Sequence, residues 1–233
     1  MANTLRRLGI LAVLIVVCLT PMSAASARTV TLDGVPVALR QGTTQVVTVN
    51  RTKGWHARVI LWEHSAKGWT AVKRTSKGAI GYGGLVTGTK RKQGTGTTPL
   101  GTYRLLGSFG THTPKKTWLT SYRQIKAGDF WVEDNESKYY NRYRNKSEGG
   151  FRWSLTSGEN TSERLSDYPR QYEFAVNTSF NYYAQVRHRG AGIFLHVNGS
   201  GATAGCASAT LTFMRTAITR LDRTRVPLIA IGR

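Results

Sequence analysis

Residues 192–208 read GIFLHVNGSGATAGCAS, and the rest of the chain is organised around them. The apolar run predicts a strand that ends near His196, a loop of small residues follows, and Cys206 stands just before a helical pattern. A thiolate attacks a carbonyl carbon well at neutral pH once a nearby imidazole takes its proton. The stretch therefore predicts a nucleophilic site in which Cys206 reacts and His196 accepts the proton.

The first 27 residues have the pattern of an export signal. Arg6 and Arg7 form a positive region, residues 8–22 are almost wholly apolar, and residues 25–27 are a small Ala-Ser-Ala cleavage site. The apolar run is shorter than the roughly 20 residues of a membrane helix, which disfavours the alternative of a single-pass anchor. We therefore expect residues 28–233 to be secreted and associated with the cell wall, with no stable membrane anchor after cleavage.

Only one of the two cysteines lies beyond the predicted signal. Cys18 is inside the apolar run, and Val17 precedes it where a bacterial lipoprotein signal needs a small residue, so lipid anchoring is not expected. Cys206 would then be alone in the exported chain and unable to form an intramolecular disulfide. A lone thiol is a liability in an oxidising compartment unless it is used. The alternative is that Cys206 has no chemical role and packs in the core as a small hydrophobic side chain.

The charge balance is strongly basic. The chain has 33 Lys and Arg against 12 Asp and Glu, a net charge of +21, and loss of Arg6 and Arg7 with the signal would leave +19. Such a charge favours polyanions: nucleic acid, anionic lipid headgroups or the acidic polymers of a cell envelope. Export favours the envelope polymers. A generally solvated basic surface is the alternative, because the basic residues are spread along the chain.

Short β-type segments dominate the sequence, and they predict one mainly β domain of ordinary size. Asp33-Gly34 is a strong hairpin signal between residues 29–32 and 35–38. Further strands are expected at Gln45–Val49, Arg58–Trp62, Thr102–Leu106, Tyr172–Val176, Tyr182–Arg187, Gly192–Val197 and Leu228–Ile231.

A single helix is expected after Cys206. Ser208 is a good N-cap, and apolar residues recur on one helical face to about Arg220. Cys206 would then lie beside a helix N-terminus, where the partial positive charge lowers the pKa of a thiol and free amides can hold an oxyanion.

Cofactor and metal sites are not expected. Residues 78–101 are rich in glycine with a basic insert at 90–92, but they match neither a P-loop nor a dinucleotide-binding pattern, so tight turns are the better interpretation. No His or Cys residues are paired at zinc spacing. The acidic residues Glu133, Asp134 and Glu136 show no metal-ligand pattern and are expected in a solvated loop.

Aromatic residues are interleaved with basic ones between Asp129 and Arg170. Such residues can stack on nucleic-acid bases, and they can equally cover a core beneath long loops. Export argues against nucleic acid as a partner.

The segment Thr203-Ala204-Gly205-Cys206 resembles the signature of the L,D-transpeptidase catalytic domain family, also called YkuD-like. The resemblance covers roughly Gly78 to Gly232, and it implies a mainly β fold, a sandwich or barrel with one helix after the catalytic cysteine. Together with the signal pattern at 1–27, it suggests an N-terminal β segment at 28–77 packed on the same domain and a catalytic domain at 78–233. Segments similar to the actinobacterial-type branch are QGTGTTPLGTYRLL at Gln93–Leu106, Phe130–Asp134, Tyr140–Asn141 and Gly192–His196.

Members of this family join peptidoglycan stem peptides. The resemblance implies that Cys206 attacks the carbonyl between the third residue and D-Ala of a tetrapeptide stem, with His196 as the base. An amine on the third residue of a second stem would resolve the thioester into a 3-to-3 cross-link. Oxyanion donors and substrate contacts are then expected at the amides of Ala204, Gly205 and Cys206 and at the side chains of Thr203 and Ser208.

The sequence departs from the family pattern at several positions. Ala204 replaces the usual His, the segment between His196 and Thr203 is short and leaves less lid over the acyl pocket, and Ser208 stands where Asn or Arg is common. Val197 can offer only its backbone carbonyl to orient His196.

Three alternatives to transpeptidation stay open. The same acyl-enzyme resolved by water would make an L,D-carboxypeptidase, and resolution by another amine would attach a protein to the wall. From a different class, a basic β-module could bind anionic wall polymer without catalysis. Within the enzymatic hypotheses, His188 is the backup base, although its basic neighbours favour a surface position.

Overall fold

A computed structural model describes residues 28–233. The predicted export signal and Cys18 lie in residues 1–27, outside the described residues. Within residues 28–233, no helix is both long and apolar enough to cross a membrane.

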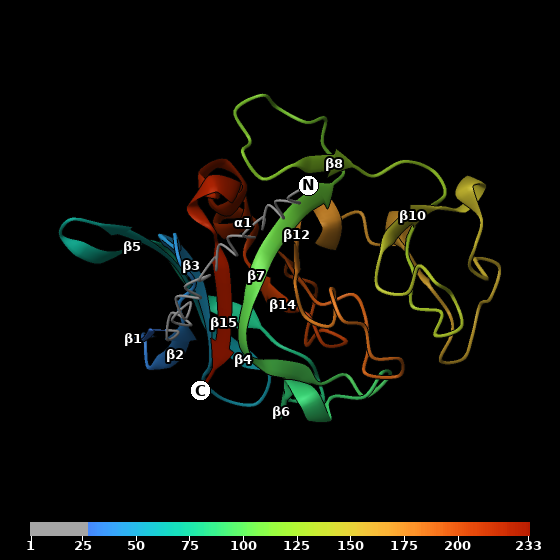
Figure 1. Cartoon of the computed structure of the whole chain (residues 1–233), viewed down its shortest axis with the longest axis horizontal. Coiled ribbons are helices and arrows are strands. Elements are labelled where there is room, and N and C mark those ends of the chain that lie inside the picture. The colour runs from blue at the N-terminus through green and yellow to red at the C-terminus, as the bar shows by residue number, and fades with distance from the viewer. Residues whose placement is uncertain (1–27) are drawn as a thin grey trace, which may run out of the picture.

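Strands make up most of the regular structure (Figure 1). They are β1 Thr29–Leu32, β2 Val35–Ala38, β3 Gln45–Arg51, β4 His56–Ser65, β5 Gly68–Ala79, β6 Leu85–Thr87, β7 Thr98–Gly110, β8 Tyr122–Gln124, β9 Asp129–Trp131, β10 Tyr143–Asn145, β11 Glu163–Arg164, β12 Ala175–Thr178, β13 Phe194–Val197, β14 Ala207–Ala209 and β15 Leu228–Gly232. The helices are α1 Leu211–Arg220 and the short 3₁₀ helices η1 Gly88–Lys90, η2 Lys146–Glu148, η3 Leu165–Asp167, η4 Gln171–Glu173 and η5 Arg223–Arg225.

The hairpin predicted at Asp33-Gly34 is confirmed. Strands β1 and β2 pair antiparallel, with Leu32 opposite Val35. Asp33 and Gly34 both have positive φ, 54° and 76°. Two such residues in succession make the type I′ turn, whose twist matches that of the flanking strands.

Eight strands close into a barrel in the order β12-β13-β14-β5-β4-β3-β15-β7, because β7 pairs again with β12. Closure removes the exposed edges that an open sheet would leave. Two of its neighbouring pairs are parallel, β13 with β14 and β3 with β15. The prediction of a mainly β fold of the sandwich or barrel type is confirmed.

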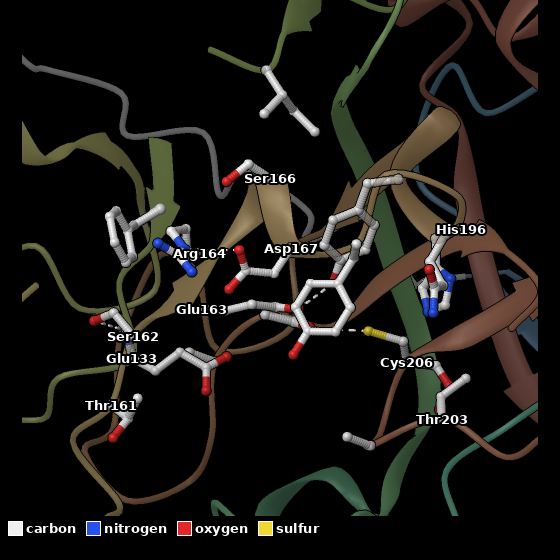
Figure 2. Close-up of a pocket in the computed structure, with 18 of the residues that line it drawn as sticks. Glu133, Thr161, Ser162, Glu163, Arg164, Ser166, Asp167, His196, Thr203 and Cys206 are labelled. Carbon is white, nitrogen blue, oxygen red and sulfur yellow. Dashed lines mark hydrogen bonds and ion pairs between the residues drawn. The ribbon is translucent and has the colours of Figure 1, made fainter. Parts of the chain in front are cut away.

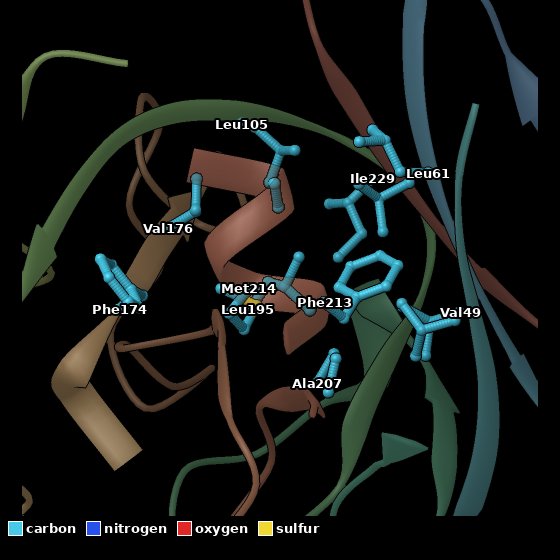
Figure 3. Close-up of a cluster of buried hydrophobic side chains, with 14 of the residues drawn as sticks. Val49, Leu61, Leu105, Phe174, Val176, Leu195, Ala207, Phe213, Met214 and Ile229 are labelled. Carbon is cyan, nitrogen blue, oxygen red and sulfur yellow. The ribbon is translucent and has the colours of Figure 1, made fainter. Parts of the chain in front are cut away.

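Helix α1 packs against the inward-facing residues of the barrel. Its buried residues Phe213 and Met214 lie in one cluster with Val49, Leu61 and Ile229 from the strands, and Figure 3 shows these side chains directed toward one another. Removing this apolar surface from water fixes the helix, and with it the chain that leads from Cys206 into the core.

A second layer lies beside the barrel and forms one wall of the site. Strands β10, β9 and β11 make a three-stranded sheet, seen beside the barrel in Figure 1. Its aromatic residues Trp131 and Tyr140 are buried in a cluster that also contains Phe194, Tyr172 and Cys206. Trp131 and Tyr140 therefore cover a core, which was one of the two alternatives for this section, whereas Trp153 is exposed.

Two of the strands predicted before the site were wrong in position. Residues 182–187 form turns, with Asn181 and His188 in the left-handed region of φ. Tyr172 lies in η4, and the strand begins only at Ala175. The predicted division at residue 78 falls within β5 and stays a prediction.

Candidate active site

Cys206 is placed by the strand that follows it. Strand β14 pairs in parallel with β13, Leu195 opposite Ala207, so Cys206 lies where the chain enters the barrel sheet. Its thiol donates to the carbonyl of Gly192 over 3.1 Å and accepts from the amide of Phe194 over 3.3 Å. Cys206 is a free cysteine, 9% exposed.

His196 lies on the neighbouring strand β13, and its ring orientation is fixed. Its Nδ1 is 2.8 Å from the carbonyl of Val197, which can only accept, so Nδ1 carries the proton and Nε2 is left with its lone pair. Tyr172 packs edge-on against the imidazole with ring centroids 5.6 Å apart. The expected backbone contact from Val197 is confirmed.

His196 and Cys206 line the same cleft, which has a volume of about 1410 Å³. Figure 2 shows the sulfur and the imidazole on one side of this cleft, with Glu133 and Glu163 across from them. The sequence stretch that suggested a thiol and a base thus brings both to one cavity.

The resting electrostatics differ from expectation. Burial raises the pKa of the Cys206 thiol well above its ordinary value, and it lowers the pKa of His196 to about 4. Both groups are therefore neutral at pH 7.

The thiol was expected beside a helix N-terminus, and that prediction was wrong. Ser208 does not cap the helix, because residues 207–209 pair as strand β14. The N-cap is Thr210, whose hydroxyl accepts from the amide of Phe213 over 3.3 Å.

The turn before Cys206 is held by the Thr203 hydroxyl. It donates to the carbonyl of Cys206 over 2.6 Å and accepts from the amide of Gly205 over 3.1 Å. The Gly205 amide is thus already bonded within the turn, which contradicts its expected role as an oxyanion donor. Within residues 28–233, the amides of Ala204 and Cys206 have no protein acceptor.

Ser208 does not face the cleft, which contradicts its prediction as a substrate contact. It is fully buried in β14, next to His196 in register, and its hydroxyl has no hydrogen-bond partner among the described residues. Thr203 and Ala204 do line the cleft, and Ala204 is exposed.

Removing the Thr203 hydroxyl tests how much it holds the turn. We expect Thr203→Val to lower the free energy of unfolding by about 1–3 kcal/mol, because one substitution removes the partner of the Gly205 amide and leaves the Cys206 carbonyl with only the longer contact of 3.4 Å from the Thr98 hydroxyl. Thr203→Ser keeps the hydroxyl and should stay close to the wild type. Urea unfolding of the three proteins measures the difference, and equal stability of the valine variant would contradict it.

His188 lies outside the cleft. Its side chain is 65% exposed, and Nδ1 is 2.8 Å from the carboxylate of Glu159. The structure therefore does not bring this backup candidate to Cys206.

The acidic section is less solvated than predicted. Asp134 is 2% exposed and forms an ion pair with Arg152, whereas Glu136 is exposed. Glu133 is half-buried and lines the cleft. A Cβ on Gly192 would lie 2.6 Å from its carboxylate, so Glu133 packs against the residue whose carbonyl accepts the Cys206 thiol.

Two acidic residues that line the cleft with Cys206, Glu163 and Glu133, were not predicted as site residues from the sequence. Glu163 accepts from the hydroxyl of Tyr172, which is buried beside His196. Burial raises the pKa of Glu163 to about 7 and that of Glu133 to about 8. The alternation of Trp131 and Glu133 along one segment is the only sequence signal that Glu133 shares the buried aromatic face.

The pKa of Glu133 predicts a stability change with pH. Because the folded protein keeps this proton up to about pH 8 and the unfolded chain loses it near its ordinary pKa, this group makes stability fall as pH rises through that window. We expect Glu133→Gln to unfold close to the wild-type temperature at about pH 4 and at a higher temperature at about pH 9. Thermal unfolding at both pH values checks this, and a lower temperature at about pH 9 would contradict it.

A thiol and an imidazole that line one cleft are the nucleophile and the base that a cysteine-dependent acyl-transfer enzyme needs. A family model for the L,D-transpeptidase catalytic domain, YkuD, matches residues 45–226. The chain therefore belongs to the L,D-transpeptidase catalytic domain family. The match begins within the predicted N-terminal segment.

Other comparisons are weak. No curated protein matches the chain significantly. A solved structure of Bdellovibrio bacteriovorus Bd1075 is similar with a TM-score of 0.39 and 14% sequence identity, and the match covers 81% of this chain and 48% of that one. The chain thus spans about half the length of that protein, and the likeness is too low to carry an argument.

No metal centre is formed within residues 28–233. No group of three or more His, Cys, Asp or Glu residues there is arranged to hold a metal ion.

Proposed function

We propose that the protein forms 3-to-3 cross-links between peptidoglycan stems through a thioester on Cys206. The observation that carries this proposal is the shared cleft, in which the His196 imidazole has its Nε2 lone pair free and the only described thiol lies immediately before the adjoining strand β14. A base and a nucleophile arranged in this way suit acyl transfer.

In the first half of the reaction, the Cys206 sulfur attacks the carbonyl between the third residue and D-Ala of a tetrapeptide stem. The thiol proton passes to Nε2 of His196, and the electron pair of the carbonyl moves onto oxygen. The amides of Ala204 and Cys206 are the proposed donors to this oxyanion, because Gly205 is bonded to Thr203. Collapse breaks the C–N bond, D-Ala leaves as an amine with the proton from His196, and a thioester remains.

In the second half, an amine on the third residue of another stem attacks the thioester carbonyl. His196 takes a proton from this amine and returns it to the departing sulfur, so that the thiol is regenerated and one amide bond has replaced another. The cleft of about 1410 Å³ is large enough for two peptide segments, since drug-sized ligands occupy sites of roughly 300–1000 Å³.

Incubation with a purified disaccharide-tetrapeptide tests the proposal. Mass spectrometry should find cross-linked dimer and free D-Ala in equal amounts. Free D-Ala without dimer would replace the proposal with an L,D-carboxypeptidase, and neither product, with binding retained, would favour a non-catalytic wall-binding module. Attachment of a wall protein would need that protein as the acceptor amine.

We further propose that the protein is exported and associates with anionic wall polymer. The support is the N-terminal sequence pattern and the net charge of +21. Binding of residues 28–233 to isolated anionic wall polymer should weaken steeply as salt rises, because the Debye length shrinks from about 10 Å at 0.1 M to about 3 Å at 1 M. Binding whose strength does not change with salt concentration would show that the net charge has no part in recognition.

A further inference from the structure

Arg91 is the only buried side chain among the lysines and arginines of residues 28–233, with 6% of its surface exposed. Its neighbours Lys90 and Lys92 are exposed. The basic insert therefore separates into two solvated charges and one that the fold encloses. Arg91 lines the cleft that contains Cys206.

Two backbone carbonyls hold the guanidinium in place. Nε donates to the carbonyl of Thr97 over 2.8 Å, and Nη1 donates to the carbonyl of Arg189 over 2.9 Å. The guanidinium also lies 5.6 Å from the ring centroid of Phe180. These contacts fix its position, but each partner is formally neutral.

Two glycines make room for the guanidinium. A Cβ on Gly190 would lie 1.4 Å from Nη1 of Arg91, and a Cβ on Gly205 would lie 2.8 Å from Nη2. Both glycines have positive φ, 103° and 136°, so a side chain at either position would also strain the backbone. Gly205 immediately precedes Cys206, which places the guanidinium directly behind the turn that presents the thiol.

The charge on Arg91 is not neutralised by an ion pair. Within the described chain, Nη2 has no hydrogen-bond partner, and no carboxylate lies within ion-pair distance of the guanidinium. Burial lowers the pKa of Arg91, and attraction to Glu133 and Cys206 opposes that effect. A buried, uncompensated charge costs stability, so its presence beside a nucleophile calls for a functional explanation.

We propose that Arg91 supplies the positive charge that stabilises the Cys206 thiolate from behind the turn. The inference rests on the proposed function, in which Cys206 is the nucleophile. It replaces the helix N-terminus that the sequence suggested and the structure does not provide. Arg91 is a positioning residue and not a catalytic one, because it acts on the reaction only through the charge state of Cys206.

The other polar groups around the thiol cannot fill this role. The carboxyls of Glu163 and Glu133 raise the pKa of Cys206, whereas Arg91 lowers it. The hydroxyl of Tyr172 and the imidazole of His196 are neutral at pH 7. Among the described residues, Arg91 is thus the cation whose charge acts to lower the pKa of Cys206.

The test is the pH dependence of Cys206 alkylation by iodoacetamide, followed by intact mass. Arg91→Met should move the midpoint of the rate profile up by about one unit or more, since an opposite charge nearby shifts a pKa by about one to three units. Arg91→Lys keeps a charge and should move it less. Lys90→Met and Lys92→Met lose the same charge at exposed positions and should leave the midpoint unchanged.

A purely structural role for Arg91 predicts the opposite sign. Loss of packing would expose the buried thiol, so Arg91→Met would react faster with no upward shift of the midpoint, and this result would overturn the inference. Should the methionine variant fail to fold, Arg91→Ala with added methylguanidinium serves instead, because the cation fits the space bounded by the two glycines. A midpoint lowered by methylguanidinium in this variant and not in the wild type supports the inference, and no change overturns it.

Failure of the inference and failure of the proposed function can be told apart. Alkylation needs no stem peptide, so an upward shift in Arg91→Met with no stem adduct on the wild-type protein overturns only the transpeptidase proposal. A stem adduct on the wild type with an unchanged midpoint in Arg91→Met overturns only the role of Arg91.

Discussion

Cys206→Ser is expected to lower the rate of acyl-adduct formation with a tetrapeptide stem by roughly 10⁴-fold or more, because loss of a catalytic nucleophile has an effect of this size in comparable acyl-transfer enzymes. The hydroxyl can still donate to the Gly192 carbonyl and accept from the Phe194 amide, so the fold should be retained. Its ordinary pKa lies far above that of a thiol, and His196 cannot ionise it as readily. Intact-mass spectrometry measures the adduct directly.

Cys206→Ala provides the second arm of this experiment. The alanine removes the sulfur from a buried aromatic cluster and should cost only a small part of the stability, while the adduct disappears entirely. Unfolding temperatures close to the wild type in both variants would show that the loss is chemical. An adduct that persists in Cys206→Ala would place the nucleophile elsewhere and end the proposed mechanism.

Local signals account for the parts of the fold that the sequence predicted correctly. Asp33-Gly34 specifies its own turn through two residues that tolerate positive φ, and the strands at 45–51 and 228–232 follow from apolar residues with β propensity. These features depend on neighbours in the chain. A single sequence is therefore enough to predict them.

The position of the helix depended on a distant contact and was predicted wrongly. Ser208 is a good local N-cap, yet residues 207–209 gain backbone hydrogen bonds as a strand beside β13, and the helix starts only after Thr210. Parallel pairing between segments separated by a loop leaves no pattern in the sequence itself. The same error produced the expectation of a low pKa for Cys206.

The site was predicted in part for the same reason. His196 and Cys206 are close in sequence, so one loop brings them together. A thiol and an imidazole also indicate by themselves a nucleophile and a base. Arg91 looks like its neighbours Lys90 and Lys92 until the fold encloses it between Gly190 and Gly205. Long-range packing, which composition does not encode, decides which of the three basic residues is buried beside the turn that precedes Cys206.

His196→Ala is expected to slow acyl-adduct formation by roughly 100-fold or more, the usual contribution of a positioned base. The structure gives the reason: Nδ1 is committed to the Val197 carbonyl, which leaves Nε2 as the acceptor for the thiol proton. The wild-type rate should also fall as pH drops through about 4, the pKa of His196, because a protonated imidazole cannot accept that proton. The adduct rate of His196→Ala should not show this fall at low pH.

His188→Ala is the matched control, because it removes an imidazole that is exposed and paired with Glu159 outside the cleft. Its adduct rate should equal that of the wild type. The variants should also respond differently to iodoacetamide. Because burial keeps His196 neutral, His196→Ala should change the alkylation midpoint of Cys206 less than Arg91→Met does. If His196→Ala kept the full adduct rate and His188→Ala lost it, His188 would be the base, and the active site would differ from the one proposed.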